Sequence, residues 1–189
     1  MDHALAVRWW AGGGFAEAPA SDVLHIVGVC GQPDRATARR TIRLALLAAL
    51  AEASGLPAAA IQLCGAPGEA PYALLDGHRI GLSISHDGHL SVAAFRLDAG
   101  AVGIDLMQVT DVPDWQAVAR DYLGPGCAAT LTGMPAFARA WSEREARLKC
   151  RGLALAEWSA SDEPLLSACS CLSLVLPDGY VGSVAVLPD

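Results

Sequence analysis

The chain has 189 residues, of which 53% are hydrophobic and 17% charged, and its formal net charge is −7. This share of apolar residues suffices for a packed core and excludes a disordered chain, while the negative charge argues against a general nucleic-acid binder. The long uncharged runs are broken by Pro, Gly and polar residues, so we expect no membrane partner. The length fits one domain or two small ones.

The N-terminal third predicts two strands followed by one long helix. The apolar runs at residues 4–10 and 23–29 are separated by three consecutive glycines, which is typical of two strands around a loop. A helix is predicted from Asp34 to about Ser54, with Asp34 as its N-cap and with Gly55 and Pro57 ending it.

The middle of the chain predicts further strands and a hairpin. Residues 61–63 and 79–84 are candidate strands, and residues 91–97 and 101–107 are two more, joined by Asp98-Ala99-Gly100. This connection has turn chemistry, so we expect the last two strands to pair as a hairpin. Asp105 is a lone carboxylate among apolar neighbours. It needs a cation, a metal or hydrogen-bond donors if buried, or it caps the next turn.

The C-terminal half predicts helices at residues 113–122 and 135–150, and then a hairpin. The hairpin is expected at residues 171–176 and 180–187, around an Asp178-Gly179 turn. On the second helix Trp141, Glu145 and Lys149 recur every four residues and therefore share one face. Taken alone, Glu145 and Lys149 also fit an ordinary exposed ion pair.

The six cysteines show neither a C-x-x-C pair nor a Cys/His zinc pattern. The start of the chain, Met1-Asp2-His3, lacks the basic segment of a signal peptide. We therefore expect free thiols in a cytoplasmic protein.

Three motifs in order resemble those of the 4′-phosphopantetheinyl transferase family. They read Ser83-Ile84-Ser85-His86, then Gly103-Ile104-Asp105, then WSEREARLKCRGLAL at residues 141–155. The resemblance to the larger, pseudo-dimeric members implies an α+β fold of two similar α/β subdomains, each a helix packed on a small antiparallel sheet. The halves would be residues 1–100 and 101–189, with the active site in the cleft between them.

The resemblance also implies an enzyme that moves the 4′-phosphopantetheine arm of coenzyme A to a serine of an apo acyl or peptidyl carrier protein. The reaction would serve fatty-acid, polyketide or nonribosomal-peptide synthesis and release 3′,5′-ADP, and the chain would act as a monomer with magnesium. The implied magnesium ligands are Asp105 and Glu145. Glu145 or a metal-bound water would accept the serine proton, and Lys149 would meet the pyrophosphate. The implied coenzyme A contacts are Ser85 through its backbone N–H, His86, and the basic start of the long helix with Arg35, Arg39, Arg40 and Arg43.

Two positions depart from the family pattern. Met107 stands where many members carry a further acid, and a thioether is a poor magnesium ligand. Glu69 lies where relatives carry a phosphate-binding lysine, for which Arg79 or an arginine of the long helix is a possible substitute. These departures motivate an alternative, a catalytically weak relative that serves as a carrier-protein-binding module.

Two further hypotheses concern a docking surface and a hydrolase. A basic docking patch for the carrier protein is predicted from Arg120, Arg139, Arg144, Arg147 and Arg151. A hydrolase that uses Ser85 and His86 together is disfavoured, because neighbouring residues of a strand face opposite ways.

Overall fold

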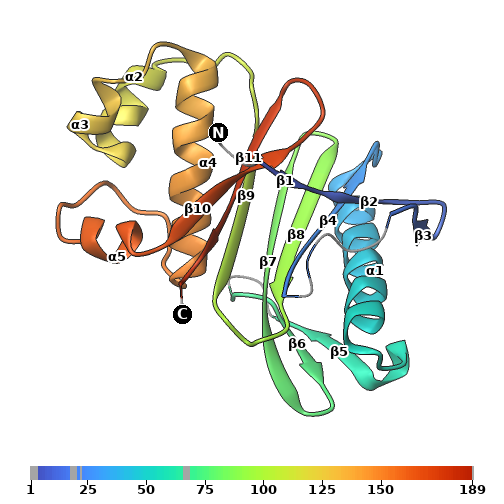
Figure 1. The fold of residues 1–189 in the computed structure, drawn as a ribbon. Helices are drawn as coiled ribbons and strands as arrows, with labels where there is room; N and C mark the ends of the chain where they lie inside the picture. The colour runs from blue at the N-terminus through green and yellow to red at the C-terminus, as the bar shows by residue number, and fades with distance from the viewer. Residues whose placement is uncertain (1–3, 18–20, 22, 66–68, 189) are drawn as a thin grey trace.

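A computed structural model of the chain describes residues 4–17, 21, 23–65 and 69–188. It contains helices and two β-sheets, so the predicted α+β class is confirmed. Among the described residues, no helix combines the length and apolar character that crossing a membrane requires. Figure 1 shows four layers, in the order α1, first sheet, second sheet, α4.

The first sheet has seven strands in the order β3-β2-β4-β8-β7-β6-β5. Its strands are β2 (Arg8–Ala11), β3 (Gly14–Phe15), β4 (Leu24–Cys30), β5 (Ile61–Cys64), β6 (Tyr72–Leu75), β7 (His78–Asp87) and β8 (Leu90–Arg96). The strands expected at residues 61–63 and 79–84 are therefore confirmed, the second over a longer span. β6 was not predicted.

Helix α1 (Arg35–Ser54) covers the outer face of this sheet and confirms the predicted long helix. The Asp34 carboxylate accepts the Thr37 N–H at 2.8 Å, which caps the first turn. Gly55 ends the helix in the left-handed conformation, at φ 71°. The 3₁₀ turn η1 (Ala58–Ala60) then leads into β5.

The second sheet has four strands in the order β1-β10-β11-β9. They are β1 (Leu5–Ala6), β9 (Val102–Gln108), β10 (Ser170–Val175) and β11 (Tyr180–Val186). β10 and β11 pair antiparallel, so the predicted C-terminal hairpin is confirmed. β1 comes from the start of the chain yet pairs with β10, so this sheet is built from both ends of the sequence.

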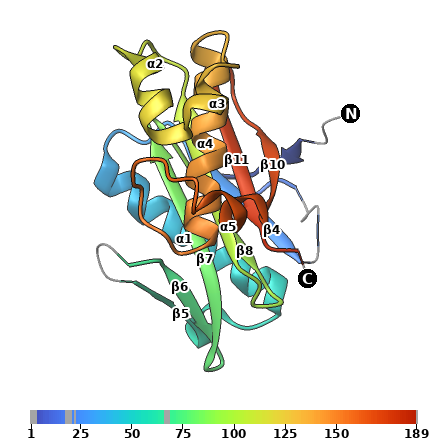
Figure 2. The ribbon, with the colours of Figure 1, turned by 90° about the vertical axis from the view of Figure 1, so that its left-hand side faces the viewer.

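Helix α4 (Met134–Cys150) covers the outer face of the second sheet and confirms the helix predicted at residues 135–150 (Figure 2). Residue 103 of β9 is a glycine, and a Cβ there would lie 2.0 Å from the Ala146 carbonyl oxygen. Only a glycine therefore permits this close approach of helix and strand. Shorter segments flank α4: α2 (Trp115–Val118), the π-helical turn η2 (Ala119–Leu123), α3 (Pro125–Ala128) and α5 (Glu163–Ser167).

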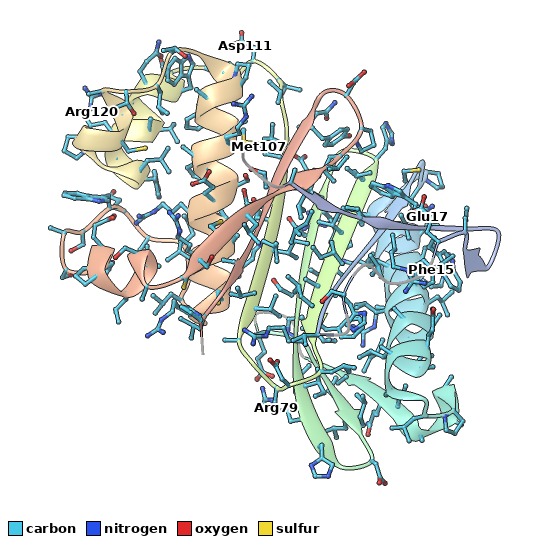
Figure 3. All side chains as sticks on the ribbon, in the orientation of Figure 1. Phe15, Glu17, Arg79, Met107, Asp111 and Arg120 are labelled. Carbon is cyan, nitrogen blue, oxygen red and sulfur yellow. The ribbon has the colours of Figure 1, made fainter. Side chains whose placement is uncertain are left out.

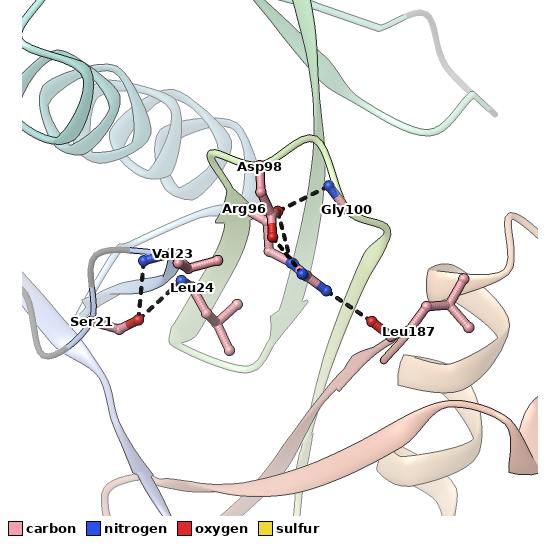
Figure 4. A network of polar contacts seen from close by, with 7 residues as sticks. All are labelled: Ser21, Val23, Leu24, Arg96, Asp98, Gly100 and Leu187. Atoms are coloured by element: carbon pink, nitrogen blue, oxygen red, sulfur yellow. Dashed lines mark hydrogen bonds and ion pairs between the residues drawn. The ribbon is translucent and has the colours of Figure 1, made fainter. Parts of the chain in front are cut away.

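The predicted hairpin of residues 91–97 and 101–107 is wrong. Both strands exist, but β8 pairs with β4 and β7, whereas β9 pairs with β11 in the other sheet. Figure 4 shows the connection: Arg96 binds the Asp98 carboxylate and also donates to the Leu187 carbonyl oxygen at 2.9 Å. The turn residues reverse the chain as expected. The bond from Arg96 to Leu187 holds this turn beside the end of β11, and the chain continues into the second sheet.

Side chains rather than a backbone ladder join β7 to β9. Three alternate side chains of β7 accept three alternate backbone N–H groups of β9, and the two series advance in the same direction. The bonds run from Ile104 N to Ser83 Oγ (2.9 Å), from Leu106 N to Ser85 Oγ (3.3 Å) and from Gln108 N to Asp87 Oδ2 (2.7 Å). They satisfy backbone donors at the seam of the two sheets.

Candidate active site

A cavity of about 490 Å³ opens where α1, β7, β9 and α4 meet. The polar part of its wall consists of Arg35, Ser85, His86, Asp87, Asp105, Glu145 and Lys149. The three sequence motifs therefore contribute to one cavity, although Ser85 and Asp105 are 20 positions apart and Asp105 and Lys149 are 44 apart.

Asp105 is the most enclosed charged group of this wall, with 6% of its surface exposed. Its Oδ1 accepts the Ser85 hydroxyl at 2.7 Å and the Lys149 ammonium at 2.6 Å. Burial raises the pKa of Asp105, while Lys149 and the Ser85 hydrogen bond oppose that shift. The sequence-level expectation that this carboxylate needs a partner is met by an ammonium and a hydroxyl.

Glu145 is half-buried in the same cavity, one helical turn before Lys149. In the part of the chain that the structure describes, no hydrogen bond or ion pair reaches its carboxylate. Burial raises the pKa of Glu145, and the negative charge of Asp105 raises it further. Two carboxylates thus repel each other across the cavity, and only Asp105 has a direct cationic partner.

Lys149 stands between two cavities. Its ammonium donates to the Ile104 carbonyl oxygen at 3.2 Å as well as to Asp105, and its side chain is 30% exposed. The same side chain lines a second cavity of about 350 Å³ together with Glu69 and Pro71. A flexible stem at this boundary can present its charge to either space.

His86 is a neutral hydrogen-bonding group rather than a cation. Burial, with help from the charges of Arg35 and Arg39, lowers the pKa of His86 to about 4. Its Nδ1 lies 2.6 Å from the Ser91 hydroxyl oxygen and not against Ser85. The hydroxyl of Ser85 is bonded to Asp105 and to the Leu106 N–H, so the two residues form no nucleophile–base pair.

The basic start of α1 reaches the site in part. Arg35 lines the main cavity and a neighbouring one of about 230 Å³ beside His86, and Arg39 acts on His86 through its charge. Arg40 bonds the Thr37 hydroxyl and Arg43 bonds the Leu63 carbonyl oxygen. Neither of these two lines the main cavity.

The rest of the cavity wall is apolar. Met107 contributes to it, and Figure 3 shows this side chain between β9 and α4. Val112, Val118 and Phe137 join it and were not predicted as site residues. Trp141 completes the wall, and its helical spacing with Glu145 was the one sequence signal for this surface.

One expectation about the arginines is wrong, and another has no supporting contact. Arg144 is buried at 7% exposure, with its NH1 atom 3.5 Å from Glu163, so it cannot belong to an exposed docking patch. Arg79 lies near the start of β7, stacks on the Tyr72 ring at 4.0 Å and lines none of the three cavities around Lys149 and His86 (Figure 3). Its replacement of the lysine absent near Glu69 stays a prediction.

Neither the protein-family models nor the curated proteins gave a match to this chain. The cavity suits a substrate with phosphate groups together with a cation. It offers two carboxylates, of Glu145 and Asp105, together with the Lys149 ammonium and the His86 imidazole. Among the described residues, no cluster of three or more His, Cys, Asp or Glu is arranged to hold a metal.

Proposed function

We propose that this chain is a 4′-phosphopantetheinyl transferase of the pseudo-dimeric type, with halves at residues 1–100 and 101–189. It would move the arm of coenzyme A to a serine of an apo acyl or peptidyl carrier protein, as a monomer in the cytoplasm. The observation that carries the proposal is the convergence of three distant motifs on one cavity. The helix-covered sheet on each side of that cavity supports the two-subdomain part of the proposal.

The residues present fit a magnesium ion held by two carboxylates. Glu145 receives no donor from the described residues, and its pKa is raised by the Asp105 charge, so a cation between the two would relieve this repulsion. Magnesium commonly takes only one or two carboxylates, and substrate phosphates and water complete its shell. Met107 would add no ligand. When bound, the ion would neutralise charge on the pyrophosphate.

The reaction is attack of a serine hydroxyl on a pyrophosphate phosphorus. The serine oxygen forms a bond to the phosphorus of the pantetheine-side phosphate, and the bond from that phosphorus to the bridging oxygen breaks. The electron pair leaves with 3′,5′-ADP. Glu145 would take the serine proton, because its carboxylate lines the cavity.

The remaining residues would bind and orient. Lys149 and Arg35 would carry positive charge to the phosphates, and neutral His86 would offer a hydrogen bond. The apolar wall with Phe137 and Trp141 would cover the pantetheine arm or the carrier surface near its serine and exclude water.

A catalytically weak, carrier-binding relative is the second candidate. Glu69 lines the 350 Å³ cavity beside Lys149 and would repel a phosphate there. This candidate predicts binding of the apo carrier without modification of it.

The deciding experiment incubates the chain with an apo carrier protein, coenzyme A and magnesium, and follows the carrier by intact-mass spectrometry. The proposed transferase adds the mass of one phosphopantetheine arm. Glu145→Gln should abolish this transfer while the melting temperature stays close to that of the wild type. Glu143→Gln is the matched control, because Glu143 lies on the same helix but lines a different cavity. Carrier binding without any mass gain would favour the second candidate.

A further inference from the structure

The Lys149 ammonium is the cation that binds Asp105 in this structure. Its Nζ lies 2.6 Å from Asp105 Oδ1, and the Ser85 hydroxyl holds the same oxygen at 2.7 Å. The Asp105 side chain is 9% exposed, so this pair is shielded from water. The carboxylate thus already has one positive charge bound to it.

An ammonium and a divalent cation cannot share this carboxylate at low cost. Like charges a few ångströms apart repel strongly in a partly buried site. The ammonium has another place to go, because Lys149 also lines the 350 Å³ cavity and has a flexible stem. That cavity offers only Glu69, an exposed residue, as a charged partner among its described lining residues. A bound phosphate would be a better one, because it carries more charge than Glu69, whose exposed carboxylate is screened by water and salt.

We propose that Lys149 couples metal binding to coenzyme A binding by exchanging one anionic partner for another. Without nucleotide, its ammonium holds Asp105 and competes with the metal. With the nucleotide bound, the ammonium pairs with phosphate and releases Asp105 to the metal. This inference rests on the proposed function and assigns Lys149 a role beyond contact with the substrate.

The coupling has a defined thermodynamic consequence. If the nucleotide raises the affinity for the metal by some factor, the metal raises the affinity for the nucleotide by the same factor. Part of this factor comes from direct metal–phosphate contact, which does not need Lys149. The contribution of Lys149 to this factor can be measured in the protein without nucleotide, where substitution of Lys149 should strengthen metal binding.

The test measures Mn²⁺ binding to the full chain by electron paramagnetic resonance of the free ion. Mn²⁺ prefers the same oxygen ligands as magnesium. Without nucleotide, Lys149→Met should bind Mn²⁺ about tenfold more tightly than the wild type, as expected for loss of one competing ion pair. With saturating 3′,5′-ADP this difference should shrink or reverse. Arg147→Met is the matched control: it removes one positive charge from α4 but lines another cavity, and should leave both affinities unchanged.

Lys149→Gln is the second variant, since it keeps a hydrogen-bond donor for Asp105 if the methionine variant does not fold. Circular dichroism establishes folding before any titration. Equal or weaker Mn²⁺ binding by a folded Lys149 variant without nucleotide would overturn the coupling, while the proposed transfer reaction would still stand. Absence of Mn²⁺ binding by the wild type, even with 3′,5′-ADP, would overturn both the coupling and the metal site of the proposed function.

Discussion

At the scale of single residues, Ser83 and Ser85 of β7 have similar surroundings but different roles. Ser83 and Ser85 are both buried, and each accepts one backbone N–H of β9. Only Ser85 also donates to the Asp105 carboxylate. Ser85 therefore joins the two sheets and orients a candidate metal ligand, whereas Ser83 joins the sheets alone.

We predict that Ser83→Ala lowers the free energy of unfolding by about 1–2 kcal/mol, because it leaves one buried N–H without its acceptor, and that Ser85→Ala lowers it by at least as much, because Asp105 also loses a donor. Only Ser85→Ala should slow the transfer reaction, through a lower kcat, since the Asp105 carboxylate loses a bond that fixes its orientation. Urea denaturation and transfer kinetics measure the two effects. Equal loss of kcat in both variants would assign Ser85 a purely structural role.

At the scale of elements, the site depends on how closely α4 packs against β9. Asp105 lies on the strand, and Glu145 and Lys149 lie on the helix. Gly103 allows the helix backbone to approach, since any Cβ at that position would meet the Ala146 carbonyl oxygen at 2.0 Å and the Cys150 nitrogen at 2.4 Å. The distance between the two carboxylates is therefore set by a residue that contributes no functional group.

We predict that Gly103→Ala destabilises the chain by about 3 kcal/mol or more, because backbone atoms rather than a flexible side chain oppose the new methyl group. The variant should also lose transfer activity, since α4 has to move away from Asp105. Gly81→Ala is the matched control: Gly81 also lies in a strand, and nothing lies within 4 Å of its Cβ position. Urea denaturation of both variants checks the difference, and similar stabilities would contradict it.

The elements were predictable from sequence wherever local signals decide them. Asp34 and Gly55 bound α1 as expected, and the four-residue spacing of Trp141, Glu145 and Lys149 places all three on one wall. The partner of β9 was not predictable. The turn at residues 98–100 fixes a reversal, but the bond from Arg96 to the Leu187 carbonyl oxygen, 91 positions away, anchors it beside the second sheet.

The same limit applies to the site. The motifs indicated which side chains would converge, but no spacing pattern shows that Asp105 is bound to both Ser85 and Lys149. The sequence pattern also did not predict the burial of Arg144. The three- and four-residue spacing of Arg144, Arg147 and Arg151 suggested an exposed stripe of α4. The structure places α5, which was not predicted, beside Arg144, and its Glu163 pairs with that arginine.

At the scale of the whole molecule, the two sheets share one core. The buried cluster between them combines Ile26, Val92 and Ala94 of the first sheet with Ile104 and Val184 of the second. The strand β8 explains the arrangement: all seven of its residues are buried, because α1 covers one face of it and the second sheet covers the other. Each half of the chain therefore relies on the other to bury part of its apolar surface.

We predict that the chain unfolds in one transition and that its halves do not fold alone. A fragment of residues 101–189 lacks β1, which pairs with β10, and loses the side-chain acceptors of β7 that satisfy three N–H groups of β9. It would also expose the apolar face of β9 to water.

Urea unfolding of the intact chain, followed by far-ultraviolet circular dichroism and by tryptophan fluorescence, should give coincident curves. Fragments 1–100 and 101–189 should show no cooperative transition separately and should regain one when mixed, because mixing restores both the shared core and β1. A cooperative transition of fragment 101–189 alone would mean that the second sheet and α4 are independently stable, and that the cleft is then an interface between two domains rather than a seam within one core.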